Sequence, residues 1–230
     1  MDLAKPHLDA GLYVHDTEAA LRFWRDEVGA RFDHVLPLRK GVRQYRHDLF
    51  GSVLKINNSR EPIAEHPPTG YLELLVAREG LEAPRSLADP EGNRVSLVPR
   101  GHLGVQKVGV RLGVRDLAAH RRFYADALLL PEVSVAGAGA AFRAGDSIVL
   151  LDEVAGAPSD ARIDGYGWRY ITFQIRKVDQ EHAFALAHGA REGTAPMTLG
   201  ETARISMIRD PDGNWIELSQ RASITGSLEP

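Results

Sequence analysis

The spacing of hydrophobic positions changes within the first thirty residues of the chain. Residues 7–14 mix apolar and polar positions as a strand does, and Asp16 then follows as a helix N-cap. After it, apolar side chains recur at helical spacing, at Ala20, Leu21, Phe23, Trp24 and Val28. Gly29 is a typical helix stop. The pattern predicts a strand and then a helix whose apolar face packs against a sheet.

Three more strands are expected directly after this helix, near residues 32–38, 42–49 and 52–57, with glycines at the turns between them. This arrangement is a β-α-β-β-β unit. The proline-rich stretch 61–68 predicts a loop, because each proline removes a hydrogen-bond donor and restricts the residue before it. A strand over residues 71–76 follows.

Two phrases of the sequence occur twice. The segment Val14–Trp24 is similar to Val114–Tyr124. The segment Asp89–Leu97, which begins Asp-Pro-Glu-Gly-Asn, is similar to Asp210–Leu218. A repeat of this length predicts two related domains. Proline and two glycines in residues 99–104 suggest the boundary, which gives segments 1–100 and 105–222.

The second copy is the fuller one. Between its two phrases the pattern predicts a strand over 168–175, a helix over 178–188 and strands over 203–208 and 214–218. The first copy passes from strand 71–76 almost directly to its Asp-Pro-Glu-Gly-Asn turn. The first domain is therefore expected to be shortened by about one helix and one strand.

Composition narrows the classes of function. The net charge is −3 and the 28 basic residues are scattered, which argues against a nucleic-acid partner. No apolar run approaches the length of a membrane span, and the first residues do not resemble a secretory signal, so we expect no membrane partner and a cytoplasmic location. The chain has no cysteine, and any metal would be held by nitrogen and oxygen ligands.

The chain resembles the vicinal oxygen chelate superfamily in a combination of motifs. These motifs are a strand followed by Val-x-Asp, a helix that contains Arg-Phe-aromatic, and a late strand with the sequence Asp-Pro-Asp-Gly-Asn-x-Ile-Glu-Leu. This superfamily includes glyoxalases, extradiol dioxygenases and bleomycin resistance proteins. The resemblance covers essentially the whole chain. It implies an α+β fold of two tandem glyoxalase-like domains built from βαβββ modules, and it leaves the reaction open because one scaffold hosts several chemistries.

The resemblance also implies where metal ligands would lie: on a first strand seven residues before the Val-x-Asp aspartate, on a middle strand, and on the last strand. In the second copy these places hold Gly109, Tyr170 and Glu217. In the first copy they hold Asp9, Tyr71 and Ser96. Neither copy supplies the three ligands that a catalytic divalent metal with open positions usually has.

Glu217 is the first candidate site residue, as a metal ligand or general base, because strand alternation turns it away from Ile216 and Leu218. Tyr170 could pair with it in metal-free proton transfer, or be a core tyrosine. Arg111 could anchor an anionic substrate or form a bridge to Glu217. The candidate substrate-binding residues are Arg111, Trp168, Thr172 and His47.

A displaced metal site is a further hypothesis. His7 and Asp9 share one strand face and could converge with Glu73, with His47 nearby. Together with Glu217 these residues are the candidate ligands of a divalent iron, manganese, nickel or zinc ion. The competing interpretation is that His7 and Asp9 are simply solvated.

Three functions remain open at this stage. The chain could be a glyoxalase-like lyase or isomerase, or an extradiol-type dioxygenase, that transforms a small oxygenated or aromatic molecule in a half-barrel cavity. It could instead sequester such a ligand without transforming it, as resistance proteins do. The shortened first domain could also leave an exposed sheet edge that pairs with a second copy, giving a homodimer.

Overall fold

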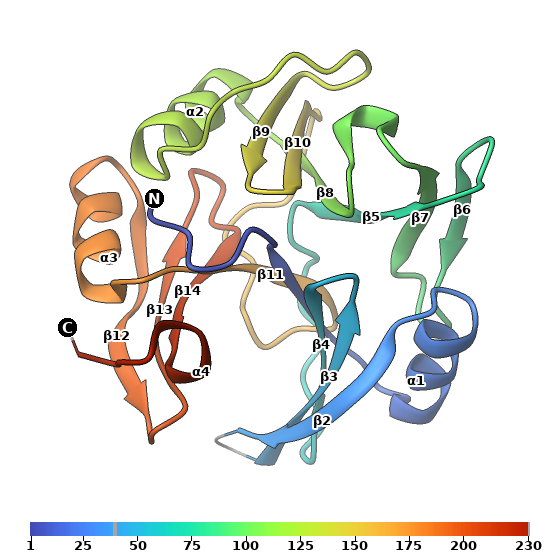
Figure 1. The fold of residues 1–230 in the computed structure, drawn as a ribbon, viewed down its shortest axis with the longest axis horizontal. Helices are drawn as coiled ribbons and strands as arrows, with labels where there is room; N and C mark the ends of the chain where they lie inside the picture. Colours follow the sequence, from blue (N-terminus) through green and yellow to red (C-terminus); the bar gives the residue numbers. More distant parts are fainter. Residues whose placement is uncertain (39–40, 230) are drawn as a thin grey trace.

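The computed structural model describes residues 1–38 and 41–229, and its ribbon consists of four consecutive modules (Figure 1). The first module contains β1 (Asp9–Tyr13), α1 (Thr17–Asp26), β2 (Arg31–Pro37), β3 (Val42–Leu49) and β4 (Ser52–Ser59). The second contains β5 (Tyr71–Arg78), β6 (Arg85–Ala88) and β7 (Arg94–Pro99). A short 3-10 turn, His102–Gly104, follows.

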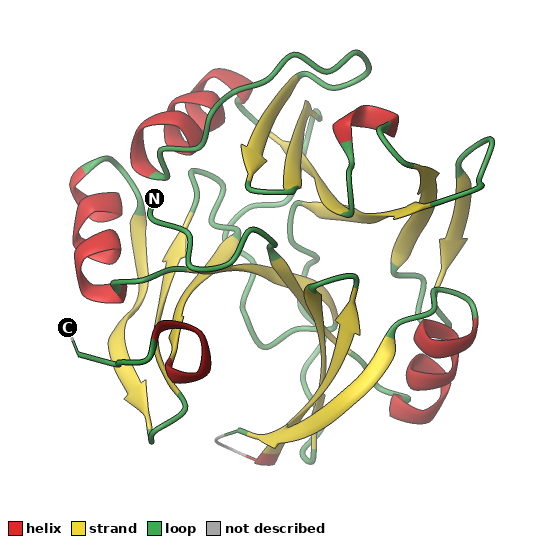
Figure 2. Cartoon of the chain, viewed as in Figure 1, coloured by secondary structure: helices red, strands yellow, loops and turns green. Residues whose placement is uncertain are grey.

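The third module contains β8 (Val108–Val114), α2 (Leu117–Arg122) with a π-helical extension (Phe123–Ala127), β9 (Ala140–Ala144) and β10 (Ser147–Glu153). The fourth contains β11 (Gly167–Gln174), α3 (Val178–Ala187), β12 (Arg191–Leu199), β13 (Ala203–Arg209) and β14 (Trp215–Arg221), and the short α4 (Ala222–Thr225) follows it. Figure 2 shows that strands dominate and that the longer helices α1, α2 and α3 lie at the periphery of the molecule. The expected α+β class is confirmed.

The strands form two sheets that do not follow the order of the modules. The eight-stranded sheet has the order β12-β13-β14-β11-β1-β4-β3-β2, and the six-stranded sheet has the order β6-β7-β5-β8-β10-β9. The first module therefore pairs with the fourth through antiparallel β1 and β11, and the second pairs with the third through β5 and β8. Each of the segments 1–100 and 105–222 contributes strands to both sheets.

The repeated phrases are explained by contacts within each sequence copy. Asp16 caps α1 by accepting from the amide of Ala19 at 2.9 Å, and Asp116 caps α2 in the same way at 2.9 Å from Ala119. The carboxylate of Glu91, in the Asp-Pro-Glu-Gly-Asn turn, accepts from the amide of Asp16. Asp212 in the second turn accepts from the amide of Arg115. Each turn therefore accepts hydrogen bonds from the start of the helix in its own sequence copy. The turn and the strand before that helix belong to different sheets.

Both sequence copies are shorter than a pair of βαβββ modules. The second module contains no helix between β5 and β7, as expected. The third module has two strands after its helix where the first module has three, and its residues 128–139 contribute only an isolated bridge at Glu132. The second copy is therefore fuller than the first, since it contains α3 and β12, without being a complete pair of modules.

The concave sides of the two sheets differ. In the six-stranded sheet a separate apolar cluster occupies this region, built from Leu75, Val98, Val105, Ala141, Ile148 and Leu150 with partly buried neighbours that include Val133 and Val135. The main core packs the helices against the sheets, with Trp24 and Tyr124 fully buried. Over the described residues no helix has both the length and the apolar character needed to cross a membrane.

Candidate functional site

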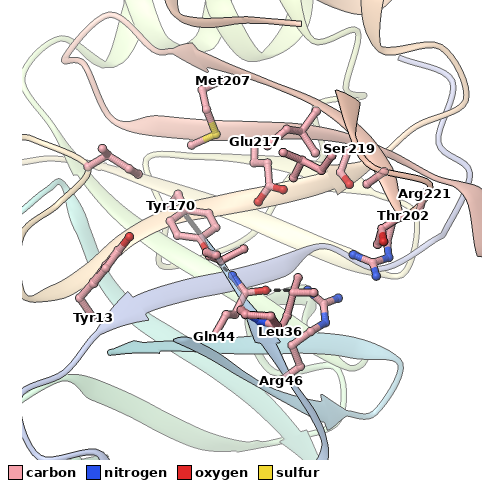
Figure 3. Close-up of a pocket in the computed structure, with 16 residues that line it drawn as sticks. Tyr13, Leu36, Gln44, Arg46, Tyr170, Thr202, Met207, Glu217, Ser219 and Arg221 are labelled. Carbon is pink, nitrogen blue, oxygen red and sulfur yellow. Dashed lines mark hydrogen bonds between the residues drawn. The ribbon is translucent and has the colours of Figure 1, made fainter. Parts of the chain in front are cut away.

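A cavity of about 380 Å³ lies on the inner face of the eight-stranded sheet (Figure 3). It is lined on one side by β2 and β3 and on the other by β11, β13 and β14, so it joins the first and fourth modules. Its apolar lining comes from Leu36, Pro37, Leu38, Ile163, Leu199, Ala203, Ile205 and Met207. Its polar lining comes from Tyr13, Gln44, Arg46, Tyr170, Thr202, Glu217, Ser219 and Arg221.

A buried ion pair lies at the wall of this cavity. The ammonium Nζ of Lys55 on β4 donates to Oε2 of Glu217 and to Oγ1 of Thr172, each at 2.7 Å. Thr172 in turn donates to the same carboxylate oxygen at 2.8 Å. The Lys55 side chain is only 3% exposed, so burial lowers its pKa, against the opposing effect of the Glu217 and Asp9 carboxylates.

Tyr170 lies beside the ion pair and is held by amide groups. Its hydroxyl oxygen accepts from Nε2 of Gln44 at 3.2 Å and from Nδ2 of Asn57 at 3.3 Å. Burial, with a smaller contribution from the Glu217 charge, raises the pKa of Tyr170 well above the usual value, so the phenol keeps its proton. That proton has no acceptor in the described part of the chain and is available to a ligand.

Strand register makes Lys55 and Glu217 equivalent. Gly11 on β1 is paired with Lys55 in the same parallel manner as Thr172 on β11 is paired with Glu217. The antiparallel β1–β11 pairing, with Asp9 opposite Thr172 and Gly11 opposite Tyr170, relates the two modules by an approximate two-fold axis. Lys55 therefore stands in the first module where the fourth module has the Glu217 carboxylate.

The residues here do not fit the divalent metal that is typical of the vicinal oxygen chelate superfamily. A cation site needs several nitrogen or oxygen donors that converge. Here the Glu217 carboxylate is already bound by the Lys55 ammonium, which repels a second cation. No group of three histidine or acidic side chains converges anywhere within residues 1–38 and 41–229.

Some of the candidate residues meet at this cavity. Glu217 and Tyr170 line it, and Thr172, which is not a lining residue, donates a hydrogen bond to the Glu217 carboxylate. Sequence reasoning missed Lys55, Arg46 and Arg221. The signal for Lys55 was present, since a lysine that lies between the apolar residues Leu54 and Ile56 of a predicted strand needs a partner if it is buried.

The other candidate substrate-binding residues lie elsewhere. Arg111 is on β8 of the six-stranded sheet, where it binds the Asp152 carboxylate at 2.5 Å, so the suggested bridge to Glu217 is wrong. The Trp168 indole donates to the Arg94 carbonyl and packs on Trp24. His47 is buried on β3 beside Phe32, and strand alternation turns it away from the face that carries Arg46.

The displaced metal site suggested by the sequence is not assembled. His7 lies next to the Lys107 ammonium, at 3.2 Å, and its pKa is lowered by burial and by that cation. Asp9 is fully buried between the Lys5 ammonium and the Gln174 amide. Glu73 accepts from the Ser96 hydroxyl in the other sheet. Strand pairing across the modules separates these residues, which alternation within one strand could not show.

Comparisons with known proteins agree with this architecture. Glyoxalase I from Zea mays superposes with a TM-score of 0.74 at 14% identity, covering 93% of this chain and 92% of that chain. A Bacillus subtilis protein described as a proposed dioxygenase superposes with a TM-score of 0.71 at 12% identity, covering 99% of this chain and 92% of that chain. At these identities the likeness shows the fold alone. No curated protein matches the sequence.

A family model extends the agreement from fold to sequence. The model of the Glyoxalase/Bleomycin resistance protein/Dioxygenase superfamily matches residues 102–218, which is half of the chain. The match includes the second occurrence of each repeated segment, Val114–Tyr124 and Asp210–Leu218. The chain therefore belongs to the Glyoxalase/Bleomycin resistance protein/Dioxygenase superfamily.

Proposed function

We propose that this protein binds a small, largely apolar molecule in the cavity of the eight-stranded sheet, without a divalent metal ion. The observation that carries the proposal is the position of the Lys55 ammonium, 2.7 Å from the Glu217 carboxylate at the wall of the cavity. A cavity of about 380 Å³ with an apolar lining and a few polar groups has the size and character of a small-molecule site.

Tyr170 is the residue expected to orient an oxygen atom of this ligand. Its hydroxyl is fixed by Gln44 and Asn57 and retains a free proton to donate. Half of the lining residues are apolar, and these would enclose the body of the ligand. A molecule with an apolar body and an exposed carbonyl, hydroxyl or carboxyl oxygen satisfies both features.

The metal part of the proposal is tested on the intact protein. Metal-stripped protein is incubated with excess Fe²⁺, Mn²⁺, Ni²⁺ or Zn²⁺, desalted, and analysed by inductively coupled plasma mass spectrometry. We expect far less than one equivalent of each metal. One bound equivalent in the wild type that is absent from Glu217→Gln would overturn this part.

The binding part is tested by a fragment screen that is read by NMR in the presence of a chelator. We expect oxygen-bearing apolar fragments to shift resonances of Leu36, Met207 and Thr202, and to bind about tenfold more weakly to Tyr170→Phe. Tyr45→Phe is the matched control, because Tyr45 neighbours Gln44 on β3 and does not line the cavity. Equal binding to both variants argues against the role of Tyr170, and a screen without binders argues against the site.

Metal-free proton transfer on the bound molecule is a second candidate function. It is favoured by one observation, that the Glu217 carboxylate and the Tyr170 hydroxyl both line the cavity and can act as base and acid on one ligand. Each fragment that binds is therefore incubated in D₂O with wild type and Glu217→Gln. Deuterium incorporation that requires Glu217 supports an enzyme, whereas its absence leaves sequestration of the ligand as the function.

A further inference from the structure

Two arginines in the cavity have unused binding capacity. Arg46 on β3 is only 4% exposed, and its Nη1 donates to Oε1 of Gln44 at 2.8 Å, while its Nε is buried without a hydrogen-bond partner. Arg221, at the end of β14, makes no side-chain hydrogen bond or ion pair with any described residue. Both guanidinium groups extend toward the same end of the cavity in Figure 3.

None of the nearby carboxylates forms an ion pair with either guanidinium group in the described part of the chain. Glu217 is bound by Lys55, and Asp9 by Lys5. Asp33 is largely exposed and lies 3.0 Å from a ring nitrogen of His34. Burial and the charge of Arg46 lower the pKa of Arg221, which these three carboxylates only partly offset. The two guanidinium groups therefore share a positive potential with no counter-ion of their own.

Such an arrangement is costly unless an anion completes it. A buried guanidinium needs an acidic partner or a full set of acceptors, and two like charges that face one space repel each other. The described residues supply no acceptor to the buried Nε of Arg46. A ligand oxyanion would provide the missing acceptors, and guanidinium groups suit it because their donors match the spacing of carboxylate oxygens.

We infer that Arg46 and Arg221 bind an anionic oxygen group of the ligand, so that the cavity takes a small apolar carboxylate. This inference rests on the proposed function and specifies its ligand class. The carboxylate lies at the arginine end, and the apolar body extends along Leu36, Ile205 and Met207. Neutral molecules of the same shape leave the arginines without an acceptor and bind more weakly.

Matched pairs of probes test the inference on the full chain. The binding of 3-phenylpropanoate and octanoate is compared with that of 3-phenylpropanamide and octanamide, by NMR titration at constant ionic strength with a chelator present. We expect each carboxylate to bind at least tenfold more tightly than its amide. Arg46→Gln and Arg221→Gln should each remove most of that difference.

Arg43→Gln is the matched control, because Arg43 lies on the same strand as Arg46, is exposed and does not line the cavity. It should bind both members of each pair as the wild type does. Arg221→Gln alters a partly exposed side chain at a strand end, so it tests the inference even if Arg46→Gln does not fold.

The outcomes separate this inference from the proposed function. Amides that bind as tightly as carboxylates, or a preference for carboxylates that survives in Arg221→Gln, overturn the inference and leave a small-molecule site in place. If neither member of any pair binds, both the inference and the proposed function are wrong for this cavity.

Discussion

Lys55 is the residue that most distinguishes this cavity from a metal centre. Its ammonium is almost completely buried, and its hydrogen bonds go to Glu217 and Thr172, on the two strands that face it across the approximate two-fold axis. A buried ion pair of this kind is not a large source of stability in itself, because the desolvation of both charges offsets their attraction. It becomes important when one member is removed.

Removal of either charge should therefore be more damaging than removal of both. We expect Lys55→Met and Glu217→Gln each to lower the free energy of unfolding by about 3 kcal/mol, since the remaining charge stays buried without a partner. The double variant should lose less than either single variant, because no unpaired charge then stays buried. Urea unfolding of the four proteins measures this. Strictly additive losses would show that the two charges do not interact as described.

Part of this site could be predicted from the sequence at the residue scale. Glu217 and Tyr170 were found from the ligand positions that the family resemblance implies, and strand alternation then gave the faces of Glu217 and Thr172. Lys55, Arg46 and Arg221 were missed because their importance depends on which strands lie opposite, in modules more than one hundred residues apart. A single-strand pattern has no information about that pairing, and for the same reason it could not show that Arg111 and Glu217 lie in different sheets.

At the scale of elements, the junction of β1 and β11 positions Tyr170. Gly11 lies directly opposite Tyr170, and a Cβ atom at Gly11 would overlap the Tyr170 ring. The ring can therefore cross over β1 toward Gln44 and Asn57 on the neighbouring strands only because position 11 has no side chain.

Gly11→Ala should displace the Tyr170 ring. We expect a loss of about 1–3 kcal/mol in the free energy of unfolding, which is typical of overpacking, together with loss of fragment binding at the cavity. Calorimetry and the NMR screen measure these two effects. In a Tyr170→Ala background the same glycine change should cost less than about 0.5 kcal/mol. An equal cost in both backgrounds would mean that the alanine clashes with something other than the ring.

Most elements of the first and fourth modules could be predicted from the sequence, because their hydrophobic residues recur at regular strand or helix spacing and typical capping residues mark the helix ends. The helix after Asp16 and the strands near residues 32–38, 42–49 and 52–57 are confirmed. The edge strand β12 was missed because it is largely exposed and its pairing with β13 shifts register twice, so that it has no regular alternation. It also contains Gly193 and Pro196, which a reader of the sequence takes as breaks.

The contact between α2 and the second Asp-Pro-Asp-Gly-Asn turn predicts a pH dependence. His120 is fully buried, with Nε2 at 3.4 Å from Asp210 and 3.6 Å from Asp212. Burial alone lowers the pKa of His120, but the nearby carboxylate of Asp210, with help from the Asp116 carbonyl and the Asp212 carboxylate, outweighs it and raises this pKa. The protonated imidazole therefore stabilises the folded state.

Because the folded-state pKa is above the unfolded value, this stabilisation is complete below the unfolded pKa of about 6.5 and disappears as the pH rises through the folded pKa. We expect His120→Gln to lose about 1–3 kcal/mol at pH 6 and clearly less at pH 9. Urea unfolding across this range measures the difference. His188→Gln is the control, because His188 lies on the exposed end of α3. A loss that is independent of pH would contradict the proposed ion pair.

At the scale of the whole molecule, the sequence repeat and the sheet topology divide the chain differently. The repeated phrases bind each other within one copy, as in the contact of Glu91 with Asp16, whereas the strands pair across the copies. The segments 1–100 and 105–222 are thus related units by sequence, but each sheet needs strands from both of them. The cavity itself has walls from the first and the fourth module.

This topology predicts that neither segment folds alone. In an isolated 105–222 fragment, β11 loses its partner β1 and β8 loses its partner β5, so two central strands become unprotected edges and the cavity loses one wall. We expect poorly dispersed NMR spectra for this fragment and for 1–104, a dispersed spectrum when the two are coexpressed, and a single urea transition for the intact chain. A fragment 105–222 that unfolds cooperatively by itself would show instead that the sequence copies are independent domains and that pairing across them is not required for stability.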